Sequence, residues 1–148
     1  MKNDKVLQKY WTALGKGDGK TMATCYADDA TFRDPIFALT GAEIGAMWRY
    51  LMDGKGDLVV ATKPLLIDNG TARGEWTATY TFTATGRKVV NHIFSNIEAH
   101  DGKIVAQEDL FPFWKWSRMA LGTSGALLGW TPIVKNKVRR MAAKRLKP

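Results

Sequence analysis

The sequence predicts an α+β fold in which three N-terminal helices pack on one face of a curved sheet. Two observations lead to this class. Early in the chain, apolar residues recur at helical spacing, whereas from Leu58 onward β-branched and aromatic residues come in runs with a period of two. Helices followed by a series of strands indicate an α+β fold with the helices on one side of the sheet.

Three helices are expected before the sheet. The first can begin at the N-cap candidates Asn3 or Asp4 and ends at the glycine-rich segment 15–19. A shorter helix is expected from about Lys20 to Ala27, and a third from about Ala42 to Met52. The apolar stripe of the first helix consists of Val6, Leu7, Tyr10, Trp11 and Leu14, and that of the third of Ile44, Met47, Trp48 and Leu51.

A short strand, Thr31–Asp34, is expected to end at Pro35. Beyond Leu58, turn sequences at 68–70, 85–86 and 101–102 divide an antiparallel meander. Period-2 alternation puts threonines on one face of the central strand and larger side chains on the other. The larger side chains are Trp76, Ala78, Tyr80 and Phe82.

The chain of 148 residues has the size of one domain, which we divide into residues 1–116 and a basic C-terminal helical extension, residues 117–148. Cys25 is the single cysteine, so no intramolecular disulfide can form. The N-terminus lacks the apolar stretch of a signal peptide, and a cytoplasmic location is therefore expected.

The net charge of +8 comes from the C-terminal end of the chain. Nine Lys and Arg residues and no acid follow Asp109, which leaves 13 basic and 14 acidic residues in the segment 1–109. A near-neutral body does not favour a nucleic-acid partner. The basic extension could dock on an anionic membrane or on a partner, or it could cover the sheet edge with its charges in water. We favour the covering role.

Two apparent motifs are excluded. The segment 15–21 resembles a phosphate-binding loop, but Leu14 stands where that loop needs a glycine, and the segment follows a helix instead of a strand. His92 and His100 share no metal-ligand spacing with Cys25 or a carboxylate. We therefore expect neither a metal nor an organic cofactor.

The informative residues are acids among apolar neighbours. Asp34 precedes Pro35 and either forms a turn or has the raised pKa of a general base. Near the end of the last strand, alternation places Gln107, Asp109 and Phe111 on one face. In the strand before it, His92, Phe94 and Asn96 share a face, either toward the core or on the sheet surface. Asp109 and His92 are candidates to complete an acid–base site beside Asp34.

Three segments resemble SnoaL-like proteins and ketosteroid isomerases of the nuclear transport factor 2-like superfamily. They are Tyr10 with Gly17-Asp18, the run from Cys25 to Pro35 (Cys-Tyr-Ala-Asp-Asp-Ala-Thr-Phe-Arg-Asp-Pro), and Gly41-Ala42-Glu43-Ile44. The Asp-Gly-Lys-Ile turn at 101–104 fits the same fold, so the resemblance covers about residues 3–116. It implies a cone-shaped domain with an apolar pocket and a homodimer formed through the outer face of the sheet.

The resemblance also implies roles for individual residues. In the isomerases the aspartate of the Asp-Pro pair shuttles a proton and a tyrosine of the first helix donates to the oxyanion, which would be Asp34 and Tyr10 here. Phe94 stands where the isomerases carry a second, acidic oxyanion donor, so the resemblance to SnoaL-like cyclases is the more informative one. Pocket residues are expected at Phe94, Asn96, Gln107, Phe111, Trp48 and Trp76.

Two classes of function remain open. The first is acid–base catalysis without a cofactor, such as cyclisation, isomerisation or hydration, on a small hydrophobic carbonyl compound. The second is a non-catalytic module that binds a hydrophobic molecule or forms oligomers, with docking through the basic extension as a further alternative. Convergent acids inside the cone would favour the first class, whereas an interior filled by Trp76, Trp114 and Phe94 would favour the second.

Overall fold

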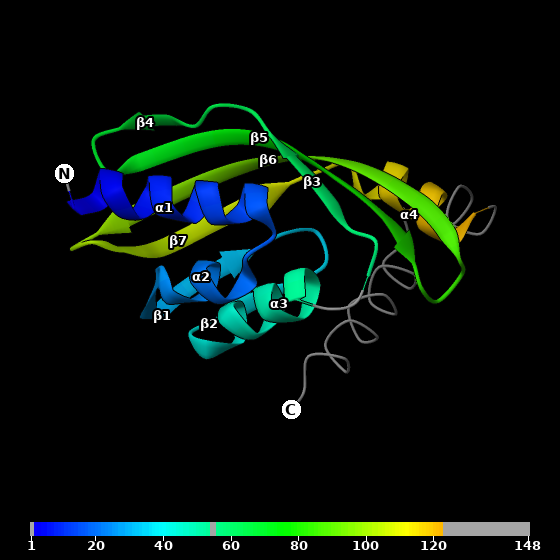
Figure 1. Ribbon diagram of the computed structural model, residues 1–148, viewed down its shortest axis with the longest axis horizontal. Helices are drawn as coiled ribbons and strands as arrows, with labels where there is room; N and C mark the ends of the chain where they lie inside the picture. The colour runs from blue at the N-terminus through cyan, green and yellow to red at the C-terminus, as the bar shows by residue number, and fades with distance from the viewer. Residues whose placement is uncertain (1, 54–55, 123–148) are drawn as a thin grey trace.

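A computed structural model describes residues 2–53 and 56–122 and confirms the α+β class. Figure 1 shows a long sheet that bends over the N-terminal helices. The helices are α1 (Lys2–Lys16), α2 (Gly19–Thr24), α3 (Ala42–Asp53) and α4 (Phe113–Leu121). The strands are β1 (Tyr26–Arg33), β2 (Ala38–Thr40), β3 (Val59–Thr62), β4 (Leu66–Asp68), β5 (Thr71–Phe82), β6 (Arg87–His100) and β7 (Lys103–Leu110).

The sheet is mixed, with the strand order β2-β1-β7-β6-β5-β3, and β4 also pairs with β5. β5, β6 and β7 form the expected antiparallel meander, whereas β1 runs parallel to β7. Three of its turns contain left-handed residues: Asn69-Gly70 between β4 and β5, Gly86 between β5 and β6, and Asp101-Gly102 between β6 and β7. Such φ values suit the tight reversals that these sequences predict.

The core lies between the sheet and the helices. α1 packs its expected apolar stripe on the sheet, α3 packs on β1 and β2, and α2 lies against α1 and α3. Aromatic rings fill the centre of this layer, because Trp48 lies within 6.2 Å, between ring centroids, of Tyr10, Phe32 and Trp76. The predicted inward face of β5 is confirmed, since Trp76 and Ala78 are buried.

The structure corrects the expected boundary between the second helix and the first strand. α2 ends at Thr24, and Tyr26 and Ala27 already belong to β1, which begins five residues before the predicted strand. Tyr26 pairs with Ile104 of β7, and a bulge separates it from the regular pairing that resumes at Thr31. The local sequence does not predict the beginning of β1, because the residue with which it pairs is about 80 residues away along the chain.

A second, smaller cluster lies at the far end of the β5–β6 hairpin. Trp116 and Ala120 of α4 pack there on Val89, and Trp116 Nε1 donates a hydrogen bond to the Tyr80 hydroxyl at 2.7 Å. Residue 116, where we expected the C-terminal extension to follow the domain, lies inside α4. This boundary stays a prediction. No helix in residues 2–53 and 56–122 is long and apolar enough to span a membrane. Most of the expected C-terminal helical extension, residues 123–148, lies outside the described residues.

Candidate functional site

The site is built around a carboxylic acid on the inner face of the sheet. Asp109 of β7 is 2% exposed, and Gln107, two residues earlier on the same strand, is 4% exposed. The predicted alternation is therefore confirmed: Gln107 and Asp109 point inward, whereas Glu108 and Leu110 are exposed. On the neighbouring strand, Ser95 is the register partner of Asp109 and is also buried.

Gln107 links Asp109 to three aromatic residues. Its amide nitrogen donates to Asp109 Oδ1 at 2.9 Å and to the Tyr10 hydroxyl at 3.0 Å. Its amide oxygen accepts a hydrogen bond from the Tyr26 hydroxyl at 2.6 Å, and Trp48 Nε1 donates to the same hydroxyl oxygen at 2.8 Å. The amide uses both of its donors and an acceptor, which holds it in one orientation beside Asp109.

A second group of partners reaches Asp109 from β6 and β5. The Ser95 hydroxyl forms a hydrogen bond with the Asp109 carboxyl and accepts one from Trp76 Nε1 at 3.1 Å. All of these partners are neutral side chains. Asp109 therefore receives donors without receiving an opposite charge from them.

Burial raises the pKa of Asp109 to about 7, and the hydrogen bonds from Gln107 and Ser95 and the charge of Asp34 modify this effect. The two hydrogen bonds stabilise the carboxylate and oppose burial, whereas the charge of Asp34 adds to it. Burial also raises the pKa of Tyr10 and of Tyr26 well above the usual range for tyrosine. At neutral pH the acid can thus take up or release a proton, whereas both phenols stay neutral.

Asp34 forms a turn at the end of β1. Its Oδ1 accepts hydrogen bonds from the backbone N–H groups of Ile36 and Phe37 at 2.7 and 2.6 Å. This is the turn-forming alternative, in which an Asx side chain holds the residues that follow it. Its charge nonetheless adds to the raised pKa of Asp109 and of Tyr80.

Three candidates lie on the opposite face of the sheet. His92, Phe94 and Asn96 are exposed, whereas their neighbours Ser95 and Ile97 are buried, so the placement of the three beside Asp109 is wrong. His92 is hydrogen-bonded through Nδ1 to the Thr77 hydroxyl at 3.0 Å on that outer face. A period of two tells which residues share a face but does not tell which face is covered.

The remaining candidates lie near the site or contribute to it. Tyr10, Trp48 and Trp76 are buried in the core, and Phe111 is half-buried between the two apolar clusters. Two further residues of the site, Tyr26 and Ser95, are not among those predicted from the sequence. The sequence pattern could have identified Ser95, because it is a polar residue on the same face of its strand as Ile93 and Ile97. It could not have identified Tyr26, because the pattern predicts a helix there.

The part of the chain that the structure describes contains no group of three His, Cys, Asp or Glu side chains able to hold a metal. Cys25 is buried as a free thiol.

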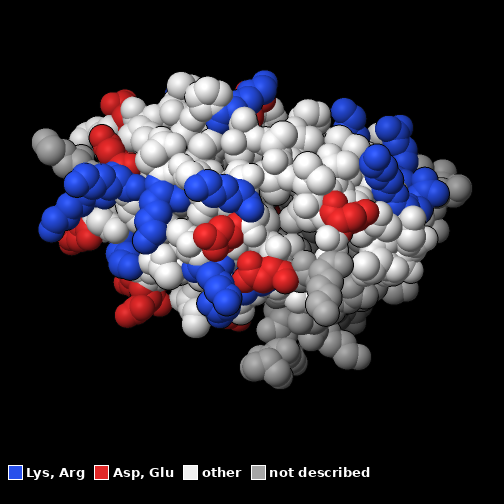
Figure 2. All heavy atoms as spheres, viewed as in Figure 1, with Lys and Arg blue, Asp and Glu red and all other residues white. Residues whose placement is uncertain are grey.

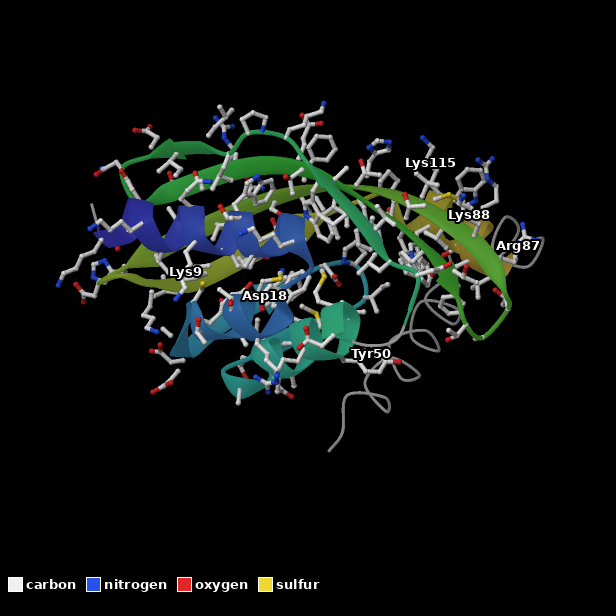
Figure 3. The ribbon with its side chains drawn as sticks, viewed as in Figure 1. Lys9, Asp18, Tyr50, Arg87, Lys88 and Lys115 are labelled. Atoms are coloured by element: carbon white, nitrogen blue, oxygen red, sulfur yellow. The ribbon has the colours of Figure 1, made fainter. Side chains whose placement is uncertain are left out.

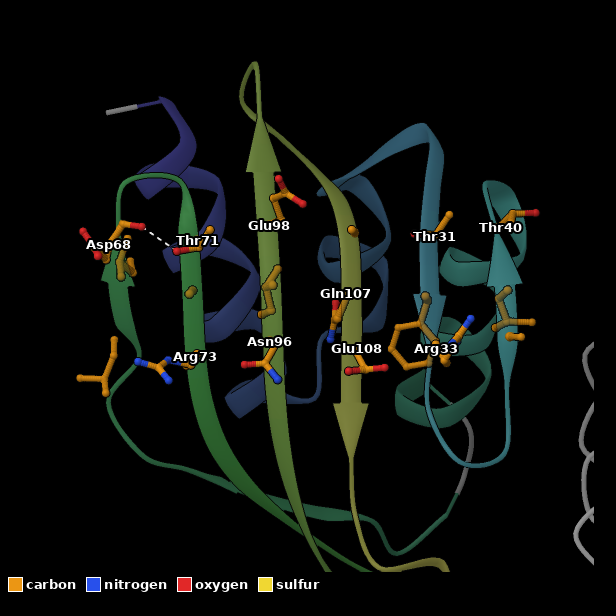
Figure 4. Close-up of a pocket in the computed structure, with 18 residues that line it drawn as sticks. Thr31, Arg33, Thr40, Asp68, Thr71, Arg73, Asn96, Glu98, Gln107 and Glu108 are labelled. Atoms are coloured by element: carbon orange, nitrogen blue, oxygen red, sulfur yellow. Dashed lines mark hydrogen bonds between the residues drawn. The ribbon is translucent and has the colours of Figure 1, made fainter.

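The outer face of the sheet carries a broad groove of about 970 Å³. Figure 4 shows that it crosses β4, β5, β6, β7, β1 and β2, with the helices behind the sheet. Its charged side chains have both signs: Arg33 and Arg73 face it together with Asp68, Glu98 and Glu108. This groove lies on the face that Asp109 points away from.

The sequence and the fold identify the same family. Residues 7–107 match the SnoaL-like domain, and the chain belongs to that family, within the nuclear transport factor 2-like superfamily. A comparison with curated proteins finds no match.

Solved structures share the fold at low sequence identity. An LEH-like epoxide hydrolase of M. tuberculosis is 19% identical, with a TM-score of 0.62 over 90% of this chain and 95% of that one. A protein from Catenulispora acidiphila with a ketosteroid isomerase-like fold, in complex with trimethylamine, is 14% identical, with a TM-score of 0.65 over 86% and 98%. TerC, co-crystallised with polyporic acid, is 14% identical, with a TM-score of 0.62 over 80% and 98%.

Proposed function

We propose that the protein is an acid–base enzyme that needs no cofactor and acts on a small, largely apolar carbonyl compound. The observation that carries this proposal is Asp109, a carboxyl that is 2% exposed, lies among aromatic rings and has a pKa of about 7. A group that exchanges a proton near the working pH is what general acid–base catalysis requires.

The expected chemistry starts with the ionised form of Asp109. The carboxylate removes a proton from the carbon next to a carbonyl group, and the electron pair of the C–H bond moves to the carbonyl oxygen as an enolate forms. Neutral Asp109 then returns the proton to the same carbon, to another carbon or to oxygen. Tyr10 stays protonated, so its role is that of a hydrogen-bonding neighbour and not of a base.

Structural relatives support the reaction class in general terms. They include an epoxide hydrolase and a protein crystallised with polyporic acid. Opening an epoxide and rearranging a carbonyl system both depend on proton transfer to or from oxygen or carbon. Asp109 is the residue to which we assign this chemistry, and the charge of Asp34 adds to its raised pKa.

The test is deuterium exchange in D2O. Acid–base catalysis on a ketone exchanges the hydrogens next to its carbonyl group, and NMR follows this exchange for a panel of cyclic and aromatic ketones. We expect the protein to accelerate exchange of at least one ketone and Asp109→Asn to lower the rate at least about a hundredfold.

The matched control is Asp29→Asn, which removes an exposed acid of β1. This variant should exchange ketones at the rate of the unchanged protein. Equal rates for Asp109→Asn and the unchanged protein would overturn the assignment.

A non-catalytic role is the second candidate, and the filled centre of the domain favours it. Trp48 and Trp76 lie 6.2 Å apart between ring centroids, and both are buried. Of the aromatic residues that we expected to fill the cone, however, Phe94 and Trp114 are 50% and 41% exposed. Binding of ketones without exchange in D2O would support this second role.

We also propose a homodimer formed through the outer face of the sheet. Phe94 and Leu110 are register partners on this face and are 50% and 44% exposed, next to the groove with charges of both signs. A face with both signs can pair with a second copy of itself across a twofold axis. A face with charges of both signs favours a second copy of this chain over nucleic acid as the partner.

Basic side chains of the described part gather at two ends of the molecule (Figure 2). Lys2, Lys5, Lys9 and Lys103 surround a small hollow beside α1. Arg87, Lys88 and Lys115 lie at the other end, beyond the groove (Figure 3). Docking on a membrane through such basic residues remains the less favoured proposal. The cytoplasm stays the predicted compartment.

A further inference from the structure

Two chains of hydrogen bonds begin at indole nitrogens and end on the carboxyl of Asp109. The first runs from Trp48 Nε1 to the Tyr26 hydroxyl, from there to Gln107 Oε1, and from Gln107 Nε2 to Asp109, over distances of 2.8, 2.6 and 2.9 Å. The second runs from Trp76 Nε1 to the Ser95 hydroxyl at 3.1 Å and from Ser95 to Asp109.

An indole N–H donates a hydrogen bond and cannot accept one, so it sets the direction of each chain. The Tyr26 oxygen accepts from Trp48, and its own proton is donated to the amide oxygen of Gln107. The amide nitrogen is then the atom that faces Asp109. In the second chain Ser95 accepts from Trp76 and donates to the carboxyl. Both groups that contact Asp109 are therefore donors.

We propose that Trp48 and Trp76 are positioning residues that determine where the proton of Asp109 lies. A carboxyl that accepts from Gln107 and Ser95 holds its own proton at a lone pair that neither of them occupies. The neutral acid thus offers its O–H to a third partner. A ligand that contacts this O–H has to carry a lone-pair acceptor such as the oxygen of a carbonyl or an epoxide, and an ammonium group, which only donates, does not fit.

The titratable groups around Asp109 do not change the inferred direction of its O–H. The titratable groups that act on it or share its hydrogen bonds are Tyr10 of α1, Tyr26 of β1 and Asp34 after β1. The two phenols stay neutral, and Asp34 has its Oδ1 on the turn 34–37. The inferred proton direction rests on geometry alone, whereas its catalytic consequence rests on the proposed function.

The test is the titration of the Asp109 carboxyl carbon by ¹³C NMR, with the signal assigned by its loss in Asp109→Asn. Ser95→Ala and Trp48→Phe each weaken one chain and leave the carboxylate with fewer donors. The midpoint should therefore rise, by roughly half a pH unit or more in each variant and further in the double variant.

Trp11→Phe is the matched control, because Trp11 is also a buried indole, and its Nε1 donates to the Lys63 carbonyl at 2.7 Å, outside both chains. This variant should leave the midpoint unchanged. An unchanged or lowered midpoint in both Ser95→Ala and Trp48→Phe would refute the proposal. Ser95→Ala removes a single oxygen, so it keeps the test available if Trp48→Phe does not fold.

A pair of probes tests the ligand class. At about pH 6, where Asp109 is mostly neutral, cyclohexanone should shift the NMR signals of Ser95 and Gln107, and cyclohexylammonium should not. The reverse preference would contradict the inferred proton direction. The titration needs no substrate, so a shifted midpoint without ketone exchange would overturn the proposed function alone.

Discussion

At Asp109, burial and ionisation of the carboxyl conflict. Its side chain is almost completely buried, and its partners Gln107 and Ser95 are neutral. Two neutral donors offset only part of the free-energy cost of burying the carboxylate, and the nearby charge of Asp34 adds to that cost. The carboxyl consequently holds its proton up to a pH of about 7, instead of losing it at the 3.8 of an exposed aspartate.

This conflict predicts how stability depends on pH. Between about pH 4 and 7 the folded protein holds a proton that the unfolded chain has already lost, so the free energy of unfolding falls as the pH rises through this window. Asp109→Asn removes this effect. Its stability relative to the unchanged protein should therefore rise by up to about 4 kcal/mol between pH 4 and 8, measured by urea denaturation.

Asp29→Asn serves as the control for this series, because Asp29 is exposed. The difference in stability between this variant and the unchanged protein should stay constant over the same pH range. A constant difference for Asp109→Asn as well would show that the carboxyl of Asp109 is ionised in the folded protein throughout.

At the scale of elements, the contact between α1 and β5 depends on a glycine. Trp11 of α1 lies directly over Gly74, and a Cβ atom at residue 74 would meet its ring carbons at 2.4 and 2.6 Å. The ring cannot move freely, because its Nε1 donates to the Lys63 carbonyl. Gly74 thus lets the first helix approach the sheet on which the site is built.

Gly74→Ala should destabilise the protein by roughly 1–3 kcal/mol, since the added methyl group either displaces Trp11 or separates α1 from β5. Urea denaturation measures this change. Gly56→Ala is the control, because a Cβ at residue 56 would have no neighbour within 4 Å. Equal stability of the two variants would mean that the helix shifts at no cost.

At the scale of the whole molecule, the two faces of the sheet carry different kinds of residues. Its inner face carries the buried acid and the aromatic core, and its outer face carries the groove and the exposed pair Phe94 and Leu110. A substitution on the outer face should therefore affect assembly and leave the environment of Asp109 unchanged.

Phe94→Lys should convert the proposed dimer into a monomer, because it places a charge in an apolar contact on both copies. Sedimentation equilibrium gives the mass. Tyr50→Lys is the control, since Tyr50 is 46% exposed on α3, on the helical side of the molecule. A monomeric unchanged protein, or a Phe94→Lys dimer, would contradict the proposed interface.

Much of the site was predictable from local pattern. Alternation in β7 placed Gln107 and Asp109 on one face, and the structure shows that this face is the buried one. His92 was placed wrongly, because alternation in β6 separates two faces without identifying the buried one. Tyr26 was missed because this end of β1 pairs with Ile104 of β7, which is far away along the chain.

The sequence by itself determined the α+β class, the turns and the candidate acids, since these depend on spacing and on turn residues that act over a few positions. The tertiary structure decided the face of His92, the turn role of Asp34 and the partners of Asp109. These depend on which strands lie side by side. The pKa of Asp109 follows from solvent exclusion and from its donors Gln107 and Ser95. Trp48 donates to Tyr26 and Trp76 to Ser95, and both indoles are far from Asp109 in the sequence.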